Sequence, residues 1–372
     1  MRILMLLARS TGGVGTHVAD LTRELCALGH EVRIATDDLT ATTFGWDDAH
    51  RIWPATGTQV PQAVRAVRDL ARGADVVHAH GHQAGSFAAV ALRSLPRRQR
   101  PSLAVSLHNA VLGGHRRRLL GAVTAQPFAR GAQLVTGASS DLVEQARRWG
   151  ADWAELAPVP SPKVPDLLAL PSPDQQERRE SAANLLAGAG LPASPGTDLV
   201  VSIARIAPQK DLPTMVAAAA AGRHRRAVWV VIGGGDHDLL AALRAQADDH
   251  DAPIHFIGAQ DDPLPWLRAA SSFVLTSHWE ARALVVQEAM AAGTPVIARD
   301  TGGLRDLVES VGILIDTDDP RVWADALGEL LDGPGAWHTA SAAGRTRAAS
   351  WPDSAATATR WVQWYADLAR MT

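Results

Sequence analysis

Residues 277–296 read Ser-His-Trp-Glu280-Ala-Arg-Ala-Leu-Val-Val-Gln-Glu288-Ala-Met-Ala-Ala-Gly-Thr-Pro-Val. The second half of this stretch predicts a helix that leads through a Gly-Thr-Pro turn into a buried strand. Glu280 and Glu288 would be ~12 Å apart in a continuous helix, which rises 1.5 Å per residue. We therefore expect Glu280 in the loop before the helix and Glu288 in its first turns. As purely structural residues, Glu280 would cap the helix and Glu288 would face solvent, although the apolar residues at 289–292 argue against an exposed helix.

Short apolar runs alternate with amphipathic stretches on both sides of this segment. This alternation predicts an α/β fold of doubly wound parallel sheets with right-handed crossovers, covered on both faces. The expected strands of the first half are 2–7, 31–36, 74–78, 103–107 and 133–136, and its expected helices are 16–28, 62–71, 86–94, 117–128 and 140–149. The expected strands of the second half are 199–203, 228–232, 254–257, 273–276, 295–298 and 312–315.

Prolines interrupt this alternation near the middle of the chain, with six of them between positions 158 and 173. Proline has no N–H to donate to a sheet ladder or a helix, so we interpret this segment as a linker. The predicted parts are a first domain at 1–160, a proline-rich linker at 161–174, a second domain at 175–350 and a terminal helix at 351–372.

Length and composition exclude several classes of protein. At 372 residues and 39.4 kDa the chain is too long for one ordinary core, and 47% hydrophobic with 20% charged residues is typical of a soluble globular protein. A net charge of −3 argues against a nucleic-acid partner. Cys26 is the only cysteine, which excludes an internal disulfide or a cysteine-based zinc site. No apolar run reaches the ~18–20 residues of a membrane span, and we expect a cytoplasmic protein.

Two further patterns suggest contacts with phosphate groups. Gly12, Gly13 and Gly15 follow the first strand, where glycines let a ligand approach and helix N–H groups favour an anion. Their spacing is not the dinucleotide fingerprint, and a tight turn is the alternative. Arg205 and Lys210 follow the first strand of the second domain, where two cations would neutralise a diphosphate or form a solvated pair.

In combination, these motifs resemble the family 4 retaining glycosyltransferases, which have the GT-B fold: two doubly wound Rossmann-like domains that face a central cleft. The resemblance covers nearly the whole chain. It implies that the first domain is the acceptor side, that the second binds a nucleotide sugar, and that the terminal helix crosses back to the first domain. The motifs that carry it are Glu280-x7-Glu288 with Ala-Met-Ala-x-Gly-x-Pro-Val, Gly12-Gly-Val-Gly-Thr-His17, the Asp75–His80 strand, the Arg205 and Lys210 pair, and Gly302-Gly303-Leu.

The resemblance also implies a role for each matching residue. Glu280 and His108 would be the catalytic residues, because they contact the donor sugar. The expected donor-binding residues are Arg205 and Lys210 at the diphosphate, Glu288 at the ribose hydroxyls, the backbone around Gly13, Gly15, Ala283 and Leu284 at the phosphates, and Gln260 near the base. Where the family has glycines, this chain has Ala281, Arg282 and Ala283, and Arg282 would either add a cation or face solvent. The family's Asn-Gly turn at the linker is also missing.

We expect no metal and no cofactor. His78, His80 and His82 alternate along an extended segment, but no carboxylate or cysteine accompanies them, so a strand is the simpler interpretation. Asp236 and Asp238 mimic a metal-binding Asp-x-Asp pattern at a turn where aspartate usually caps a helix.

The predicted function is retaining transfer of a sugar from a nucleotide-diphosphate donor to an unidentified acceptor hydroxyl. The acceptor is expected to be lipid-linked or anionic, since Arg116, Arg117 and Arg118 head an apolar helix that suits an anionic membrane, an anionic acceptor or plain solvent. Two alternatives stay open: a nucleotide-sugar epimerase of the same fold, and a non-catalytic nucleotide-sugar-binding protein.

Overall fold

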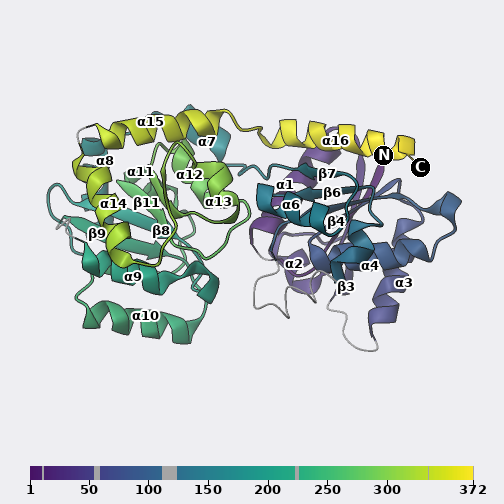
Figure 1. Ribbon diagram of the computed structural model, residues 1–372, viewed down its shortest axis with the longest axis horizontal. Helices are drawn as coiled ribbons and strands as arrows, with labels where there is room; N and C mark the ends of the chain where they lie inside the picture. Colours follow the sequence, from purple (N-terminus) through teal and green to yellow (C-terminus); the bar gives the residue numbers. More distant parts are fainter. Residues whose placement is uncertain (11, 54–58, 111–123, 223–225, 334, 372) are drawn as a thin grey trace. The chain divides into compact units, whose positions relative to one another are not determined.

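The chain forms two compact units, each built on a parallel sheet (Figure 1). The computed structural model describes residues 1–10, 12–53, 59–110, 124–222, 226–333 and 335–371. Unit 1 comprises Met1–Pro162 with Pro352–Thr372, and unit 2 comprises Lys163–Trp351. Among helices in the described ranges, none combines the length and the apolar character that crossing a membrane requires.

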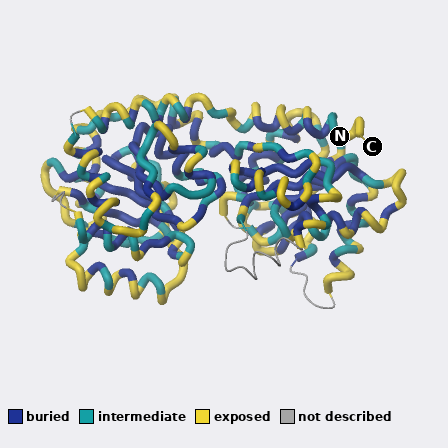
Figure 2. The backbone as a smooth tube through the Cα atoms, in the orientation of Figure 1, coloured by how far each residue is buried: buried dark blue, intermediate teal, exposed yellow. Residues whose placement is uncertain are grey.

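Within the described residues, unit 1 has a seven-stranded parallel sheet in the order β3-β2-β1-β4-β5-β6-β7. Its central strands are apolar and buried, and Figure 2 draws them dark blue. The register pairs His80, the last residue of β4, with Ser106 of β5, so residues that follow these two strands emerge at the same edge. The strands are β1 (Arg2–Leu7), β2 (Glu31–Asp37), β3 (His50–Trp53), β4 (Val76–His80), β5 (Ser102–Leu107), β6 (Leu134–Gly137) and β7 (Ala154–Leu156).

The terminal helix α16 (Ser354–Met371) belongs to unit 1, although it follows unit 2 in sequence. Trp361, Trp364, Tyr365 and Leu368 are almost completely buried in one core cluster with residues of β1 and α1. The Tyr365 hydroxyl lies 2.7 Å from Nδ1 of His78 on β4. The other helices of the unit are α1 (Gly13–Ala27), α2 (Asp38–Thr43), α3 (Val60–Ala71), α4 (His82–Arg93) and α6 (Ser140–Arg148), with a 3₁₀ turn at Arg97–Gln99.

Unit 2 has a six-stranded parallel sheet, within the described residues, in the order β10-β9-β8-β11-β12-β13. The strands are β8 (Asp198–Ile203), β9 (Ala227–Ile232), β10 (Ile254–Phe256), β11 (Ser272–Leu275), β12 (Val296–Arg299) and β13 (Ile313–Ile315). The helices are α7 (Val164–Ala169), α8 (Gln175–Gly188), α9 (Leu212–Ala221), α10 (His237–Asp249), α11 (Leu264–Ala269), α12 (Leu284–Ala291), α13 (Gly302–Val308), α14 (Pro320–Asp332) and α15 (Ala336–Ala349), with a 3₁₀ turn at Pro208–Lys210.

The structure departs from the expected elements in three places. Strands β3 and β7 were not expected, because four and three residues at the two edges of a sheet carry little apolar pattern. The segment 161–174, expected to be a linker, contains α7, whose Val164 and Leu167 are buried in the core of unit 2. The expected helix at 117–128 lies largely outside the described residues.

Candidate active site

Lys210 and Glu280 form an ion pair in unit 2. Lys210 belongs to the loop after β8 and Glu280 to the loop after the neighbouring strand β11. Nζ of Lys210 donates to Oε1 of Glu280, and the two side chains are 15% and 13% exposed. Both loops follow carboxyl ends of parallel strands, which is where open α/β sheets bind ligands. The pair therefore places one cation and one carboxylate at a ligand-binding edge.

Hydrogen bonds between the two loops hold this ion pair in place. Thr276 Oγ1 donates to the main-chain oxygens of Lys210 at 3.0 Å and Asp211 at 2.9 Å. The Gln209 side-chain amide donates to the main-chain oxygen of Trp279 at 2.7 Å. The backbones that carry the two charges are thus fixed relative to each other.

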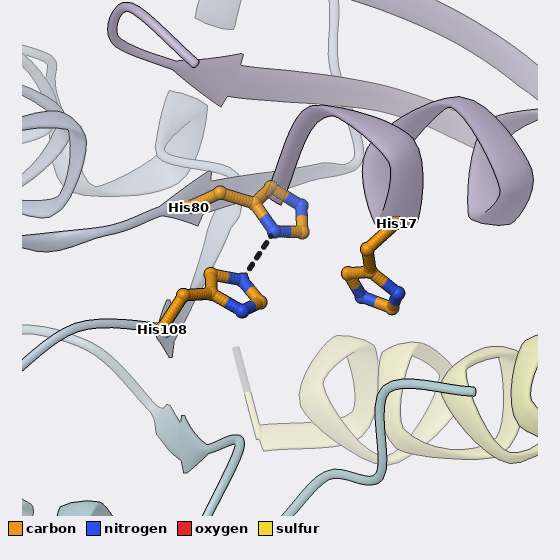
Figure 3. A group of neighbouring side chains, drawn as sticks. All are labelled: His17, His80 and His108. Atoms are coloured by element: carbon orange, nitrogen blue, oxygen red, sulfur yellow. Dashed lines mark hydrogen bonds between the residues drawn. The ribbon is translucent and has the colours of Figure 1, made fainter. Parts of the chain in front are cut away.

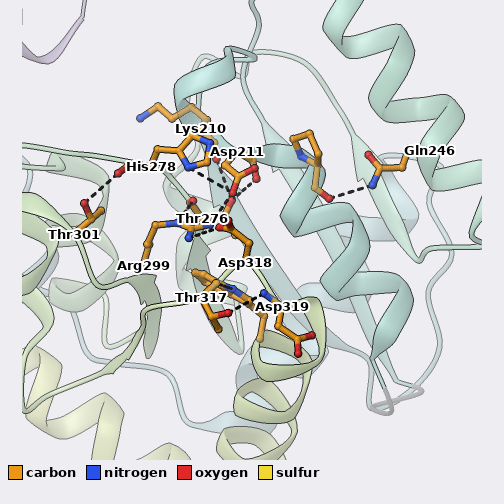
Figure 4. Close-up of polar contacts among 12 residues, drawn as sticks. Lys210, Asp211, Gln246, Thr276, His278, Arg299, Thr301, Thr317, Asp318 and Asp319 are labelled. Atoms are coloured by element: carbon orange, nitrogen blue, oxygen red, sulfur yellow. Dashed lines mark hydrogen bonds and ion pairs between the residues drawn. The ribbon is translucent and has the colours of Figure 1, made fainter. Parts of the chain in front are cut away.

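A buried arginine at the end of β12, Arg299, supports the same region (Figure 4). It donates to the main-chain oxygen of Thr276 at 2.8 Å and to the carboxylates of Asp211 and Asp318, each at 2.6 Å. Asp211 has a left-handed backbone with φ 47°, a conformation that the contact with Arg299 helps to maintain directly beside Lys210. Sequence reasoning missed Arg299, and the only available signal was a charged residue ending an apolar strand.

Asp211, His278 and Asp318 place potential ligand atoms within 4.8 Å of one another. The guanidinium of Arg299 already binds both carboxylates, so it supplies the positive charge that such a cluster requires. This group is accordingly explained as an ion-pair network around Arg299.

Arg205 lies on the exposed part of the loop after β8, next to the glycine-rich loop after β9. The Ile206 N–H donates to the oxygen of Gly234, and the Asp236 N–H donates to the oxygen of Ile206, both at 2.9 Å. A Cβ at Gly235, which has φ 153°, would lie only 2.3 Å from the oxygen of Ile206, so this close approach requires glycine. The Asp236 side chain caps α10, which confirms the cap predicted for the Asp-x-Asp pattern.

Glu288 lies in the second turn of α12, which begins at Leu284, so the expected placement of both glutamates is confirmed. Its side chain is buried, at 6% exposed. Ala283 precedes the helix with φ −69° and ψ 104°, which any L-residue adopts, so alanine fits where the family has glycine. In the first turn of α12 the Val286 N–H already donates to the Ala283 oxygen at 3.1 Å, whereas the earliest N–H groups of a helix generally have no intrahelical partner and favour an anion.

Arg282 packs against an aromatic ring, so of the two expected alternatives the solvent-facing one is wrong. Its guanidinium carbon lies 5.4 Å from the centre of the Trp351 ring. Burial lowers the pKa of Arg282 to about 10, and its Nε atom is buried without a hydrogen-bond partner among the described residues. The Arg282 side chain is therefore directed at Trp351 and not at solvent.

The Gly302 loop contacts the backbone of Glu280, and the loop that carries Gln260 follows the edge strand β10 of the same sheet. Gly302 has φ 48°, and a Cβ there would lie 2.3 Å from the oxygen of Glu280, while the Gly303 N–H donates to that oxygen at 2.8 Å. Gln260 lies in the exposed loop after β10, where its side-chain amide donates to the oxygen of Ile257 at 3.2 Å. The requirement for glycine at 302 explains the Gly-Gly motif noted in the sequence.

In unit 1, the expected phosphate-binding glycines begin helix α1. Gly13 is exposed, whereas Gly15 is buried and its N–H donates to Ser10 Oγ at 3.0 Å. A Cβ at Gly15 would lie 2.2 Å from the Phe44 ring. In this structure Gly15 is therefore explained by packing, and Gly13 is the better placed of the two to meet a ligand.

Three histidines from different elements of unit 1 lie close together, one of them on the helix α1 that the glycines begin (Figure 3). His17 comes from α1, His80 ends β4 and His108 follows β5, and all three are buried. His80 Nδ1 lies 3.0 Å from His108 Nε2. Burial lowers the pKa of His17 to about 4, the pKa of His108 to about 3, and the pKa of His80 well below its usual value. The cluster is therefore neutral at pH 7.

His78, His80 and His82 do not form one group: His78 and His80 lie on β4, whereas His82 begins α4. His82 is directed elsewhere and stacks on Trp149 with ring centres 5.4 Å apart. His78 hydrogen-bonds Tyr365 and Ser106, each at 2.7 Å, which is a structural role. His17 lies beside His80 and His108 instead. This contact was not predicted from the sequence, because His17 is far from the other two histidines in the chain. Arg116, Arg117 and Arg118 lie outside the described residues.

Comparison with known proteins identifies the chain's family. Residues 12–162 match the glycosyl transferase 4-like domain, and residues 197–333 match the glycosyl transferases of group 1. A D-inositol 3-phosphate glycosyltransferase from Jonesia denitrificans is 30% identical over 85% of this chain and 82% of its own length. The chain belongs to the group 1 glycosyl transferases. The two parallel-sheet α/β domains of the chain match solved glycosyltransferase structures with the GT-B fold.

Some other relatives of this glycosyl transferase match over a smaller part of their length. A D-inositol 3-phosphate glycosyltransferase from Xylanimonas cellulosilytica is 31% identical over 62% of this chain, which spans 56% of that relative. Among solved structures, Anabaena Alr3699/HepE in complex with UDP has a TM-score of 0.83 at 19% identity, covering 99% of this chain and 100% of that protein. The structural likeness establishes the GT-B fold.

Proposed function

We propose that this glycosyl transferase moves a sugar from a nucleotide-diphosphate donor to an acceptor hydroxyl with retention of anomeric configuration. The observation that carries the proposal is the Lys210–Glu280 ion pair at the carboxyl edge of the unit 2 sheet, with Arg205 and Glu288 on neighbouring segments. Cations and helix N–H groups at such an edge suit a diphosphate, and a carboxylate suits sugar hydroxyls.

The proposed division of labour follows the charges of the side chains. Lys210 and Arg205 bind the diphosphate, and Glu288 accepts hydrogen bonds from the ribose diol. Glu280, released from Lys210 as the diphosphate takes its place, contacts the donor sugar at the reacting end. The solved Anabaena structures with UDP and with UDP-glucose support a nucleotide sugar as donor, since their fold is the same.

The proposed chemistry needs no metal at the leaving group. As the bond between sugar and diphosphate breaks, negative charge develops on the β-phosphate, and the two cations and the helix N–H groups stabilise it. The acceptor hydroxyl attacks on the face from which the diphosphate leaves, and its proton passes to an oxygen of the departing diphosphate as the new glycosidic bond forms. Because attack and departure share one face, the configuration is retained.

The acceptor is proposed to be a hydroxyl-rich compound that carries an anionic group. The relatives named D-inositol 3-phosphate glycosyltransferases make a polyol phosphate the first compound to test. Contact with an anionic membrane through Arg116, Arg117 and Arg118 stays a prediction: replacing all three with serine is expected to reduce co-sedimentation with anionic vesicles, and unchanged co-sedimentation would contradict it.

A panel of UDP-, GDP- and ADP-sugars tests the proposal, first by thermal shift and then by product analysis with polyol phosphate acceptors. We expect one donor to raise the melting temperature and to release its nucleoside diphosphate only when an acceptor is present. Conversion of the donor into a second nucleotide sugar without any acceptor would indicate an epimerase. Binding without turnover of any donor and acceptor pair would indicate a non-catalytic binding protein.

A further inference from the structure

The rings of His80 and His108 face each other in line. The two facing nitrogens are 3.0 Å apart, the ring centres are 5.3 Å apart, and the ring planes differ by 15°. The distance between the ring centres exceeds the distance between the two nitrogens by 2.3 Å (5.3 Å minus 3.0 Å). This is about twice the distance from the centre of an imidazole ring to one of its nitrogens, so both nitrogens lie on the line between the centres. The contact is therefore a direct N–H···N hydrogen bond, visible as the dashed line in Figure 3.

This hydrogen bond contains one proton when both rings are neutral, and the buried surroundings decide which ring carries it. Nε2 of His80 is buried and has no hydrogen-bond partner among the described residues. If His108 donated, the proton of His80 would sit on that isolated Nε2 as an orphaned buried N–H. If His80 donates from Nδ1, only a lone pair is left unpaired at Nε2, and an unpaired buried acceptor is tolerated more often than an unpaired buried donor.

We propose that His80 is a positioning residue that fixes the tautomer of His108, so that His108 carries its proton on Nδ1 and offers it to a ligand oxygen. Nε2 of His108 accepts from His80, which leaves Nδ1 as the only N–H of that ring. In Figure 3 the second nitrogen of His108 lies on the side of the ring away from His80. A neutral N–H donor recognises a hydroxyl or ring oxygen of a sugar.

The same geometry argues against a metal between these rings. His17, His80 and His108 offer nitrogens within 4.8 Å of one another, but the two closest nitrogens are directed at each other and share a proton. A metal would require the hydrogen bond to break and both rings to turn. His17, with its ring centre 5.5 Å from that of His108 and 5.9 Å from that of His80, packs beside the pair.

The tautomer of His108 is directly measurable in the ligand-free protein by long-range proton–nitrogen correlation NMR with ¹⁵N-labelled histidine, assigned from single-histidine variants. We expect the wild type to show a protonated Nδ1 and a bare Nε2 at His108. His80→Asn keeps an amide N–H near the position of Nδ1 and should preserve this tautomer, whereas His80→Leu removes the donor and should shift His108 toward a protonated Nε2.

His78→Leu is the matched control, because His78 lies on the same strand and is equally buried but bonds Tyr365 and Ser106. The centre of the His78 ring lies 4.0 Å from that of His80, so this variant also tests whether packing alone sets the tautomer. It should lower the melting temperature without changing the tautomer of His108. A protonated Nε2 at His108 in the wild type, or an unchanged tautomer in His80→Leu, would overturn the proposal.

The consequence for turnover rests on the proposed function and is measured separately. In a transfer assay, His80→Leu should lower kcat/KM about tenfold, the size expected for one hydrogen bond, and His80→Asn should restore most of it. Equal losses in both variants would contradict the positioning role, even with the tautomer as expected. Absence of transfer in the wild type would instead count against the proposed function, and the tautomer measurement would stand.

Discussion

Among single residues, Lys210 is the one whose charge matters most for the proposed binding of a diphosphate. It is one of only two lysines in the chain, and its partly buried ammonium group is paired with Glu280. A diphosphate offers this cation more negative charge than one carboxylate does, so donor binding should exchange the partner of Lys210. The ion pair of the ligand-free protein thus keeps both groups compensated until a donor arrives.

Lys210→Ala should slow transfer by about a hundredfold or more, the scale for losing one preorganised charge contact to the leaving group. Single-turnover measurements with saturating donor would check this. The other lysine supplies the control, because Lys163 lies at the start of unit 2 before α7 and Lys163→Ala should keep its rate. Similar rates in the two variants would remove Lys210 from the diphosphate site.

Glu288→Ala should weaken binding of the nucleoside diphosphate by roughly 2–4 kcal/mol, since it removes the buried carboxylate proposed to accept hydrogen bonds from the two ribose hydroxyls. Calorimetric titration measures this change directly, and Glu288→Gln, which keeps the shape, should show a smaller loss. An affinity equal to that of the wild type would mean that the ribose is bound elsewhere.

At the scale of elements, Arg178 of α8 joins several segments of unit 2 through carbonyl groups. Its guanidinium is fully buried, and burial lowers its pKa to about 9, so it remains largely charged at pH 7. It donates to the oxygens of Arg268 at 2.8 Å, Ala270 at 3.1 Å and Ala292 at 2.6 Å. Arg178 therefore connects α8 to the ends of α11 and α12.

Arg178→Met should lower the free energy of unfolding by roughly 3 kcal/mol or more, because several buried carbonyls lose their donor at about 1–3 kcal/mol each. Urea unfolding of the variant would measure it. The exposed Arg244 of α10 is the matched control, and Arg244→Met should change stability by less than about 0.5 kcal/mol. Equal stabilities would show that water replaces the guanidinium.

The buried histidines of α1 and of the loop after β5 make the stability of the protein depend on pH. The pKa values of His17 and His108 are lowered by burial to about 4 and about 3, from about 6.5 in the unfolded chain. The unfolded state therefore binds more protons below pH 6.5, so this stabilisation is complete above pH 6.5 and is lost progressively as pH falls toward 4.

Urea unfolding at pH 7.0, 6.0 and 5.0 should accordingly show a free energy of unfolding that decreases with each step. In His17→Leu the decrease over this range should be smaller, since one group that gains a proton on unfolding is gone. A wild-type stability independent of pH between 7 and 5, or an identical slope in the variant, would contradict the assignment of neutral buried histidines.

At the scale of the whole molecule, the sequence predicted the two α/β domains because buried parallel strands such as β1 and β8 are continuous apolar runs. It also placed Glu280 before α12 and Glu288 inside it, because that pattern is local. It could not predict the meeting of His17 with His80 and His108, or that of Arg299 with Asp211, since tertiary folding joins distant residues. The roles of Gly15 and Arg282 could not be predicted either, because their neighbours Phe44 and Trp351 are far away in the sequence.

Metal independence is a prediction about the whole reaction. Lys210, Arg205 and the helix N–H groups are proposed to neutralise the leaving diphosphate, so transfer should continue in excess EDTA. A preparation that loses transfer in EDTA and regains it with Mg²⁺ or Mn²⁺ would show that the phosphate site has been misassigned. The acidic groups around Arg299 would then be the first to re-examine.

We expect unit 2 to bind the diphosphate of a nucleotide donor through Lys210. To test this, the nucleoside diphosphate and the nucleoside monophosphate of the same base are titrated by calorimetry into the wild type and into Lys210→Ala. In the wild type, the diphosphate should bind at least about tenfold more tightly than the monophosphate, and in the variant most of this difference should disappear. Equal affinities for the two nucleotides in the wild type, or an undiminished difference in the variant, would contradict the claim.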